Sequence, residues 1–184
     1  MQIKSLIGGK NSILSFNLQV FLLQIYNFNI VRAYIKIKNK TIMTINQLSI
    51  FIENRSGTLI KVLEVLKQSG IQIVASTIAD TAEYGIYRLI CSEPMRAYDE
   101  LKKAGVAVAL SDVFAIELDN QPGRAADAIE TFSKAGISIT YMYSFLLNGK
   151  GILIFRTDNA EQARETILQN GLKYISEQDL TALA

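Results

Sequence analysis

Histidine and tryptophan are both absent from this chain of 184 residues, and cysteine occurs once, as Cys91. Without histidine the chain lacks the commonest general base and the commonest metal ligand of proteins. A lone cysteine forms no internal disulfide, and no histidine is present to activate it as a nucleophile. Cys91 ends an apolar run that begins at Ile86, so we expect its side chain in the core. These absences disfavour an enzyme, and we predict no catalytic residue, no metal site and no cofactor.

Acidic residues are missing from positions 1–42, which contain six basic ones. Because the whole chain has 19 basic and 17 acidic residues, positions 43–184 retain 13 basic and 17 acidic residues and a net charge of −4. A mildly acidic body disfavours a surface that binds a phosphate backbone. We therefore expect no nucleic-acid partner.

The segment 1–42 differs from the rest, because it is rich in Ile, Asn, Lys and Phe without a period of 2 or 3.6. The apolar stretch 13–31 is interrupted by five Asn or Gln residues, and no small-residue cleavage site follows it. It therefore matches neither a spanning helix nor a signal peptide. We interpret residues 1–42 as a disordered leader or a mis-assigned start, with Met43 as the true start. We expect a cytoplasmic protein with no membrane partner.

The sequence after Met43 contains an internal repeat that aligns without a gap. Four pairs of glycines stand in register: Gly57 with Gly123, Gly70 with Gly136, Gly85 with Gly151, and Gly105 with Gly171. Asn54 likewise matches Asn120. Because four glycines in register are hard to explain by chance, we predict two copies of one module, at 46–111 and 112–177.

Each copy has the pattern β-α-β-β-α-β. A strand with alternating apolar residues leads through a short turn into a helix with apolar residues at i, i+3, i+4 and i+7. Two further strands, a second helix and a short last strand follow. Those strands are predicted at 71–79, 85–91 and 106–110 in the first copy, and at 137–146, 151–156 and 172–175 in the second. Ser92 and Asp158 are the predicted N-caps of the second helices. The sequence thus predicts an α+β fold of two ferredoxin-like βαββαβ modules with antiparallel sheets, joined side by side.

The turn between the first strand and the first helix is the segment best suited to bind a ligand. A helix N-terminus presents unpaired N–H groups and a partial positive charge, which suit a carboxylate. A glycine there lets a ligand approach the backbone, and Pro122 near the first helical turn loses no needed hydrogen bond. The same residues also make a plain turn and helix start. Spacing alone leaves both interpretations open.

The segment Asn-Gln-Pro-Gly-Arg at 120–124, followed by Ala-Gly-Ile-Ser-Ile at 135–139, resembles the ACT domain. The pair of copies is similar to the small stand-alone tandem ACT proteins of bacteria over residues 46–176. The resemblance implies a non-catalytic regulatory protein that binds a free amino acid at the strand-1/helix-1 turns. It places the ligand at a module interface, against the second strand of the neighbouring module. It also implies a homodimer and a regulated enzyme as partner.

The resemblance carries ligand-binding residues over to both copies. In the turns it implicates Asn54, Arg55, Ser56, Gly57 and Thr58, and Asn120, Gln121, Pro122, Gly123 and Arg124. In the second strands it implicates Ser76 and Thr77, and Tyr141, Met142 and Tyr143. The first copy departs from the family pattern, because Ser56 stands where proline is usual. For the strand residues, packing in the core or at the module interface is the alternative role.

Three other functions are weighed against amino-acid binding. An enzyme is disfavoured because the chain has no histidine, no paired catalytic carboxylates and no phosphate-type glycine-rich loop. An RNA-binding module of the same element order needs aromatic residues in a basic, glycine-spaced third strand, and segments 85–89 and 151–155 lack them. The remaining alternative is a structural dimerisation or regulatory-subunit module with no ligand of its own.

Overall fold

The computed structural model describes residues 26, 30, 43–81 and 83–183 of the chain. The chain divides into two units, residues 1–41 and 42–184, and the fold described below is that of the second unit. The prediction for the leader lies outside the described residues. Within the described residues, no helix combines the length and apolar character needed to cross a bilayer.

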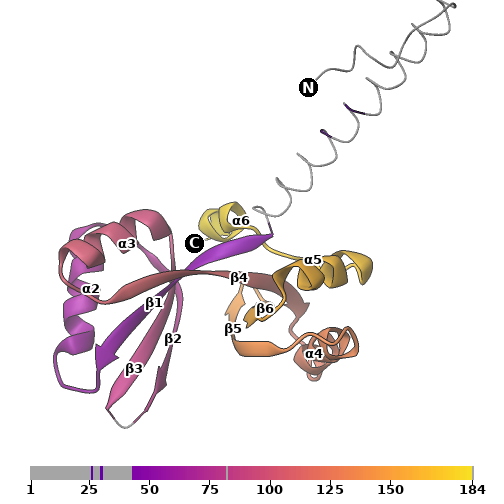
Figure 1. Cartoon of the computed structure of the whole chain (residues 1–184), viewed down its shortest axis with the longest axis horizontal. Helices are drawn as coiled ribbons and strands as arrows, with labels where there is room; N and C mark the ends of the chain where they lie inside the picture. The colour runs from indigo at the N-terminus through magenta and orange to yellow at the C-terminus, as the bar shows by residue number, and fades with distance from the viewer. Residues whose placement is uncertain (1–25, 27–29, 31–42, 82, 184) are drawn as a thin grey trace, which may run out of the picture. The chain divides into compact units, whose positions relative to one another are not determined.

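Both copies begin with the same order of elements, strand, helix, strand, strand, helix (Figure 1). The first copy contains β1 (Thr44–Glu53), α2 (Thr58–Gln68), β2 (Ile73–Asp80), β3 (Tyr84–Cys91) and α3 (Pro94–Lys103). The second contains β4 (Val108–Asp119), α4 (Arg124–Lys134), β5 (Ile139–Leu147), β6 (Lys150–Thr157), α5 (Ala160–Gln169) and α6 (Glu177–Leu183). In the register set by the glycine pairs, α4, β6 and α5 begin and end at the same positions as α2, β3 and α3. The predicted α+β class of two ferredoxin-like modules is confirmed.

All six strands form one antiparallel sheet in the order β2-β3-β1-β4-β6-β5. The centre of this sheet is β4, which pairs with β1 over residues 108–114 and with β6 over residues 114–119. The last strand of the first copy therefore continues into the first strand of the second without a turn. The sequence explains this, because no glycine or proline lies between Val106 and Asp119 to end the strand.

The last strand of the second copy is reduced to a single bridge between Tyr174 and Ile116. Two backbone hydrogen bonds support it: the amide of Glu117 donates to Lys173 at 2.8 Å, and the amide of Ile175 donates to Ala115 at 2.9 Å. This segment therefore continues along the edge of β4 from the point where β1 begins.

Each copy has its own core between two helices and the sheet. Leu48, Leu66 and Leu101 belong to the first core, and Phe132, Phe155 and Ile167 belong to the second. Cys91 is buried in the first core, as predicted.

A third buried cluster joins the sheet faces that the helices leave open. Members from the first copy include Ile45, Ala75 and Ile90, and members from the second include Val113 and Ile154. The open faces of the two half-sheets therefore cover each other. This matters for stability because a small module has a thin core of its own.

The second helices begin one residue later than predicted. The cap of α5 is Asn159, whose Oδ1 accepts a hydrogen bond from the amide of Gln162 at 3.1 Å. The cap position of α3 is Glu93, and the Ser92 hydroxyl instead accepts from the amide of Gln72 at 3.1 Å. The predicted caps were wrong by one residue: the amides of Ser92 and Asp158 still donate to the carbonyls of Gln72 and Ser138, just before β2 and β5, which holds both residues at the ends of β3 and β6.

Helix α6 was not among the elements predicted from the sequence. Its first turn is held by a reciprocal pair, in which the Ser176 hydroxyl donates to Asp179 Oδ2 at 2.6 Å and accepts from the Asp179 amide at 3.2 Å. Leu180 is buried in the cluster between the open faces. The signal was present in the sequence, since Ser-x-x-Asp is a capping-box pattern.

Candidate functional site

The turn of the first copy is held by its neighbouring hairpin. The amide Nδ2 of Asn54 donates to the Thr81 carbonyl at 2.6 Å, and the Asn54 backbone amide donates to Glu83 at 3.0 Å. The Thr58 hydroxyl donates to the carbonyls of Glu53 and Arg55 at 2.7 and 2.9 Å. Asn54 and Thr58 therefore act as structural groups of the turn, and their side chains are already engaged.

The second copy builds the same turn with charged groups. Asp119, the last residue of β4, accepts from Lys150 at 2.7 Å and lies 3.5 Å from Arg124. Arg124 also lies 3.4 Å from Asp127 in the first turn of α4. The hydrogen bond from Lys150, more than any other contact, holds the pKa of Asp119 below its ordinary value. This network is solvent-exposed, and the Arg124 guanidinium is partly neutralised within it.

The two glycines have nearly identical backbone geometry. Gly57 has a φ of 91° and a ψ of −17°, and Gly123 has a φ of 90° and a ψ of −18°. No side chain caps the helix that follows either glycine, and a Cβ added at either position would meet no atom within 4 Å. The first amides of the two helices, those of Thr58 and Arg124, donate to carbonyls of their own turns at 3.3 and 3.4 Å. No side chain caps either N-terminus, in contrast to α5, which Asn159 caps.

The second-strand candidates divide between the two faces of the sheet. Tyr141 and Tyr143 pack against the cluster between the open faces. Thr77 lies on the same face of the sheet as Ala75, which belongs to that cluster, because side chains two residues apart on a strand point the same way. Ser76 is exposed on the opposite face, and Met142 is half exposed there.

The structure does not bring the tyrosines to the turn of their own copy. The hairpin beside that turn joins Leu147 to Lys150, whereas Tyr141 pairs with Arg156 near the other end of β5. Six residues of extended strand separate Tyr141 from Leu147, which is on the order of 20 Å. The turn of the second copy and the tyrosines of the same copy are therefore two separate locations.

A polar group sits between the open faces, around the fully buried Gln47. Its Nε2 donates to the Tyr141 hydroxyl at 2.7 Å, and its Oε1 accepts from the Tyr143 hydroxyl at 3.0 Å. The guanidinium of Arg88 lies over the Tyr141 ring at 3.9 Å from its centroid. Burial raises the pKa of Tyr143 well above its ordinary value, with the neighbouring Tyr141 adding to the shift and Arg88 opposing it. We call Gln47, Arg88, Tyr141 and Tyr143 the inter-module cluster.

Gln47 and Arg88 were not among the site residues predicted from the sequence. The signal that could have found them is the repeat itself, because the corresponding positions of the second copy are Val113 and Ile154. Where one copy has a polar residue on its open face and the other copy has an apolar residue at the same position, the fold itself does not require the polar residue. Such a mismatch therefore indicates a specific role for the polar side chain.

The described part of the chain contains no group of three or more His, Cys, Asp or Glu side chains arranged to hold a metal ion. Cys91 is buried, and burial raises its pKa to about 11. The geometry of the described residues therefore offers two helix N-termini without a side-chain cap, each preceded by a left-handed glycine, and a buried polar cluster between the modules.

Comparisons with known proteins agree on the type of module. A family model described as an ACT domain pair matches residues 43–184. A crystal structure of a protein from Bacteroides thetaiotaomicron shares 38% sequence identity with the chain, covers 78% of it and 99% of its own length, and superposes with a TM-score of 0.74. A search of curated proteins finds no match.

Two more distant structures share the fold. The regulatory subunit of aspartate kinase from Thermus thermophilus has 15% identity and a TM-score of 0.51, covering 70% of this chain and 93% of its own. The corresponding subunit from Thermus flavus has 17% identity and a TM-score of 0.50, covering 70% and 92%.

Proposed function

The chain belongs to the ACT domain pair family, and on this premise we propose that it is a non-catalytic regulatory protein that binds a free amino acid. The ligand carboxylate lies against the backbone amides at the glycine turns before α2 and α4. A stand-alone module of this kind regulates a separate enzyme, so the proposal includes an enzyme partner in the cytoplasm.

The observation that carries this proposal is the repeated uncapped turn. Gly57 and Gly123 share one left-handed conformation, and neither α2 nor α4 receives a side-chain cap. A carboxylate at such a helix N-terminus accepts hydrogen bonds from the free amides and is stabilised by the helix dipole. The open space around both glycines leaves room for it.

The experiment is calorimetric titration of the full chain with a panel of free amino acids. We expect one class of amino acid to bind, and we expect Gly123→Val to abolish binding at the second turn. A β-branched residue at a φ of 90° is strained, and its side chain fills the space proposed for the ligand.

Gly136→Val is the matched control, because Gly136 also has a positive φ of 70° and open space around it but lies at the C-terminal end of α4. Both variants carry similar backbone strain, so only a loss of binding confined to Gly123→Val supports the turn. Normal binding by that variant, together with normal binding by Gly57→Val, would overturn the turn as the site. No binding of any amino acid to the wild type favours a dimerisation module without a ligand.

We further propose that the protein is a homodimer paired along the sheet edges. Both β2 and β5 are edge strands of the six-stranded sheet, and Ile78, Met142 and Leu146 on them are 45%, 50% and 64% exposed. Unpaired edges with exposed apolar side chains favour association.

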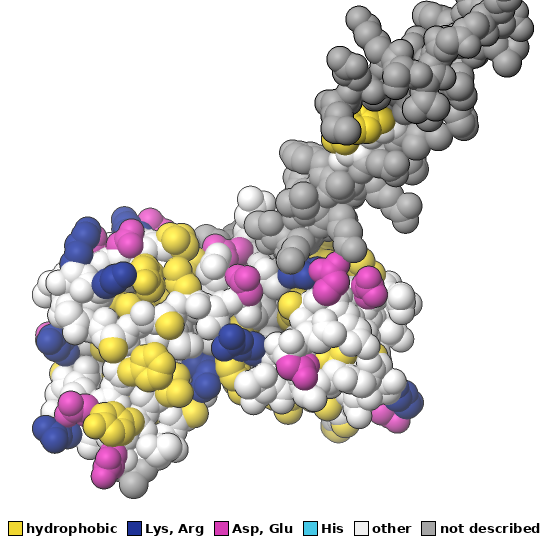
Figure 2. All heavy atoms as spheres, viewed as in Figure 1, with side chains coloured by type: hydrophobic (Ala, Val, Ile, Leu, Met, Phe, Trp, Pro, Cys, Tyr) yellow, Lys and Arg dark blue, Asp and Glu magenta, His cyan; other side chains and the backbone are white. Residues whose placement is uncertain are grey.

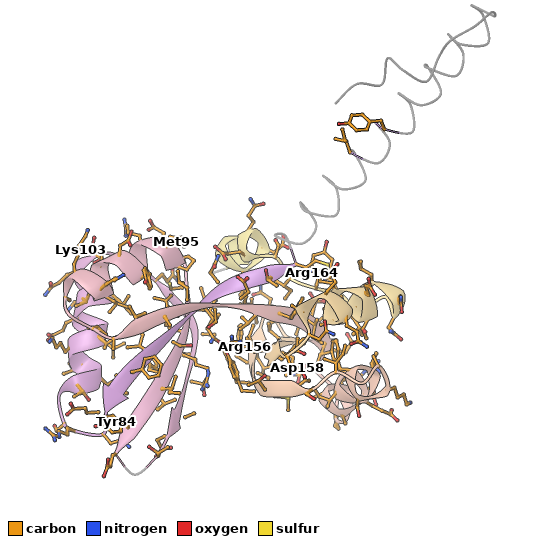
Figure 3. All side chains as sticks on the ribbon, viewed as in Figure 1. Tyr84, Met95, Lys103, Arg156, Asp158 and Arg164 are labelled. Carbon is orange, nitrogen blue, oxygen red and sulfur yellow. The ribbon has the colours of Figure 1, made fainter. Side chains whose placement is uncertain are left out.

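Light scattering after size exclusion tests this proposal, with a dimer mass expected for the wild type. Met142→Lys is expected to shift the mass toward the monomer, because a charge would face the apolar partner strand. Met95→Lys is the control, since Met95 is 58% exposed on α3, away from either edge (Figure 3). A monomeric wild type at micromolar concentration contradicts the dimer.

A further inference from the structure

The inter-module cluster contains a positive charge without an ionic partner. Arg88 projects from β3 between the open faces of the two half-sheets, and its Nε is buried with no hydrogen-bond acceptor. Its guanidinium contacts the Tyr141 ring, and within the described residues it forms no salt bridge. A buried charged donor left without an acceptor is costly, and among the described residues the face of the Tyr141 ring is the group recorded against the positive charge of the guanidinium.

A second arginine is paired in the sheet with the same tyrosine. Arg156 on β6 is directly opposite Tyr141 on β5, and residues opposite each other in an antiparallel pair share a face with Cβ atoms about 5 Å apart. Arg156 is exposed and, in the part of the chain that the structure describes, forms no ion pair. Tyr141 is thus contacted by an arginine of the first module and paired in register with an arginine of the second. Figure 3 labels Arg156 at the junction of the two halves, and Figure 2 shows dark blue side chains gathered there.

Arg164 provides a comparison within the same chain. Its Nε is also buried without an acceptor, but its guanidinium forms a 3.2 Å ion pair with Glu161 and donates to the Ala160 carbonyl. The charge of Arg164 is therefore balanced by the protein itself. The charges of Arg88 and Arg156 are not, although residues 43–184 carry more acidic than basic groups.

The repeat shows that packing does not require these charges. The positions of the other copy that correspond to Arg88 and Arg156 are Ile154 and Ile90, and both are buried in the cluster between the open faces. The same sheet-to-sheet contact is therefore apolar at one place and cationic at the other. The neighbours of Arg88 in register, Thr77 on β2 and Ser49 on β1, are small hydroxyl residues whose side chains can donate hydrogen bonds.

An apolar surface continues from this pair along the open face of the first copy. Phe51 pairs with Ile86, two residues before Arg88 on β3, and Phe51 is 52% exposed. Tyr84, one row further, is 58% exposed (Figure 3). Figure 2 shows yellow side chains next to the dark blue group at the junction. The surface thus offers cations at one end and aromatic area at the other.

From this arrangement we propose a second ligand site, distinct from the glycine turns, at which Arg88 and Arg156 bind the carboxylate or phosphate group of a small organic anion. The planar guanidinium groups form charge-assisted hydrogen bonds with either group. The apolar part of the ligand packs on Phe51. Because the two arginines come from different modules, the bound anion joins the two half-sheets.

Calorimetric titration of the full chain with phenyl phosphate and with phenylacetate tests the site, with benzyl alcohol as an uncharged probe of the same size. We expect saturable binding of at least one anionic probe and none of the alcohol. Preference for phenyl phosphate assigns a phosphate-bearing ligand, and preference for phenylacetate assigns a carboxylate. Absence of saturable binding by both anions overturns the proposal.

Arg156→Gln is the decisive variant, because Arg156 is exposed and has no described partner whose loss would disturb folding. We expect it to weaken anion binding at least about tenfold, the effect of losing one charge-assisted hydrogen bond. Lys103→Gln removes the same charge from the exposed surface of α3 and is expected to bind as the wild type does. Equal affinity of Arg156→Gln and wild type overturns the site.

Arg88→Met is expected to abolish anion binding without lowering the melting temperature, since it removes the unsatisfied Nε and keeps the stem of the side chain. If that variant does not fold, Arg156→Gln alone decides. The site is also separable from the turns: Gly123→Val should retain anion binding, and Arg156→Gln should retain amino-acid binding. If Gly123→Val instead loses anion binding and Arg156→Gln loses amino-acid binding, both ligands bind at one place, and the proposal of a second site is overturned.

Discussion

At the scale of single residues, Gln47 shows how one buried side chain can hold two others through hydrogen bonds. It is fully buried and satisfies two tyrosine hydroxyls at once. Its counterpart in the second copy is Val113, so the fold accepts an apolar residue at an equivalent position. A polar side chain at position 47 is therefore explained by its hydrogen bonds with Tyr141 and Tyr143, and the strand itself does not require one.

Gln47→Val is expected to destabilise the protein by about 1–3 kcal/mol, because it leaves the two tyrosine hydroxyls without their buried partner. Adding Tyr141→Phe and Tyr143→Phe removes those hydroxyls and should recover part of the loss. Urea denaturation of the single, double and triple variants measures the coupling. Additive effects would mean that the hydrogen bonds do not act as a unit.

Cys91 gives a prediction about pH. Burial raises its pKa to about 11, so at pH 8 only about one native thiol in a thousand is ionised. We expect a disulfide reagent to react slowly with the native chain and rapidly in denaturant. Because the folded pKa is raised, the contribution of the thiol to stability is complete below about pH 8.5 and is lost as the pH rises toward 11. Fast labelling of the native protein at pH 8 would contradict the burial.

At the scale of elements, the helices differ in how their N-termini are satisfied. Asn159 caps α5 and Ser176 with Asp179 caps α6, whereas α2 and α4 begin at uncapped glycines. Hydrogen bonds from Ser176 lower the pKa of Asp179. Glu93 at the start of α3 makes no side-chain cap either, but Pro94 occupies the first turn of that helix. Among the described helices, α2 and α4 combine an uncapped N-terminus with a left-handed glycine, and these are the helices at which the ligand is proposed to bind.

Ser176→Ala is expected to lower stability by about 1 kcal/mol, since it removes the reciprocal cap of α6. Loosening α6 also exposes Leu180, which is buried between the open faces. Ser133→Ala is the control, because Ser133 is exposed on α4 and alanine favours a helix interior. Thermal unfolding compares the two, and an equal midpoint would contradict the capping role.

At the scale of the whole folded unit, β4 makes the two modules inseparable. It completes the sheet of the first copy and begins that of the second, and the open faces share one buried cluster. The unit is expected to unfold in one cooperative transition, because neither half keeps its sheet when β4 is broken.

Inserting a short flexible segment after Leu110 is expected to lower stability strongly, because it interrupts the pairing of β4 with β1 in mid-strand. The same insertion in the turn at Asn148 and Gly149 is the control and should cost little, since that turn joins two strands at the surface. Urea unfolding measures both. Comparable midpoints would show that the modules do not depend on a continuous β4.

The duplication, the order of elements and the two glycine turns could all be predicted from the order of the residues. These features are local: a period of 2 or 3.6 distinguishes strand from helix, and a left-handed position selects glycine at Gly57 and Gly123. Capping was predicted less well, and Asn159 was missed by one residue. Two adjacent polar residues can each cap, and the hydrogen bonds of the preceding strand decide between them.

The folded arrangement was needed to establish that the last strand of one copy is the first strand of the next, and that Tyr141 and Tyr143 meet Gln47. The Gln47–Tyr141 hydrogen bond joins residues 94 positions apart. No local pattern encodes such a contact, because it depends on the sheet bringing two open faces together through β4. The inter-module cluster is therefore a property of the folded pair of modules, whereas each glycine turn is determined by the local sequence of its own copy.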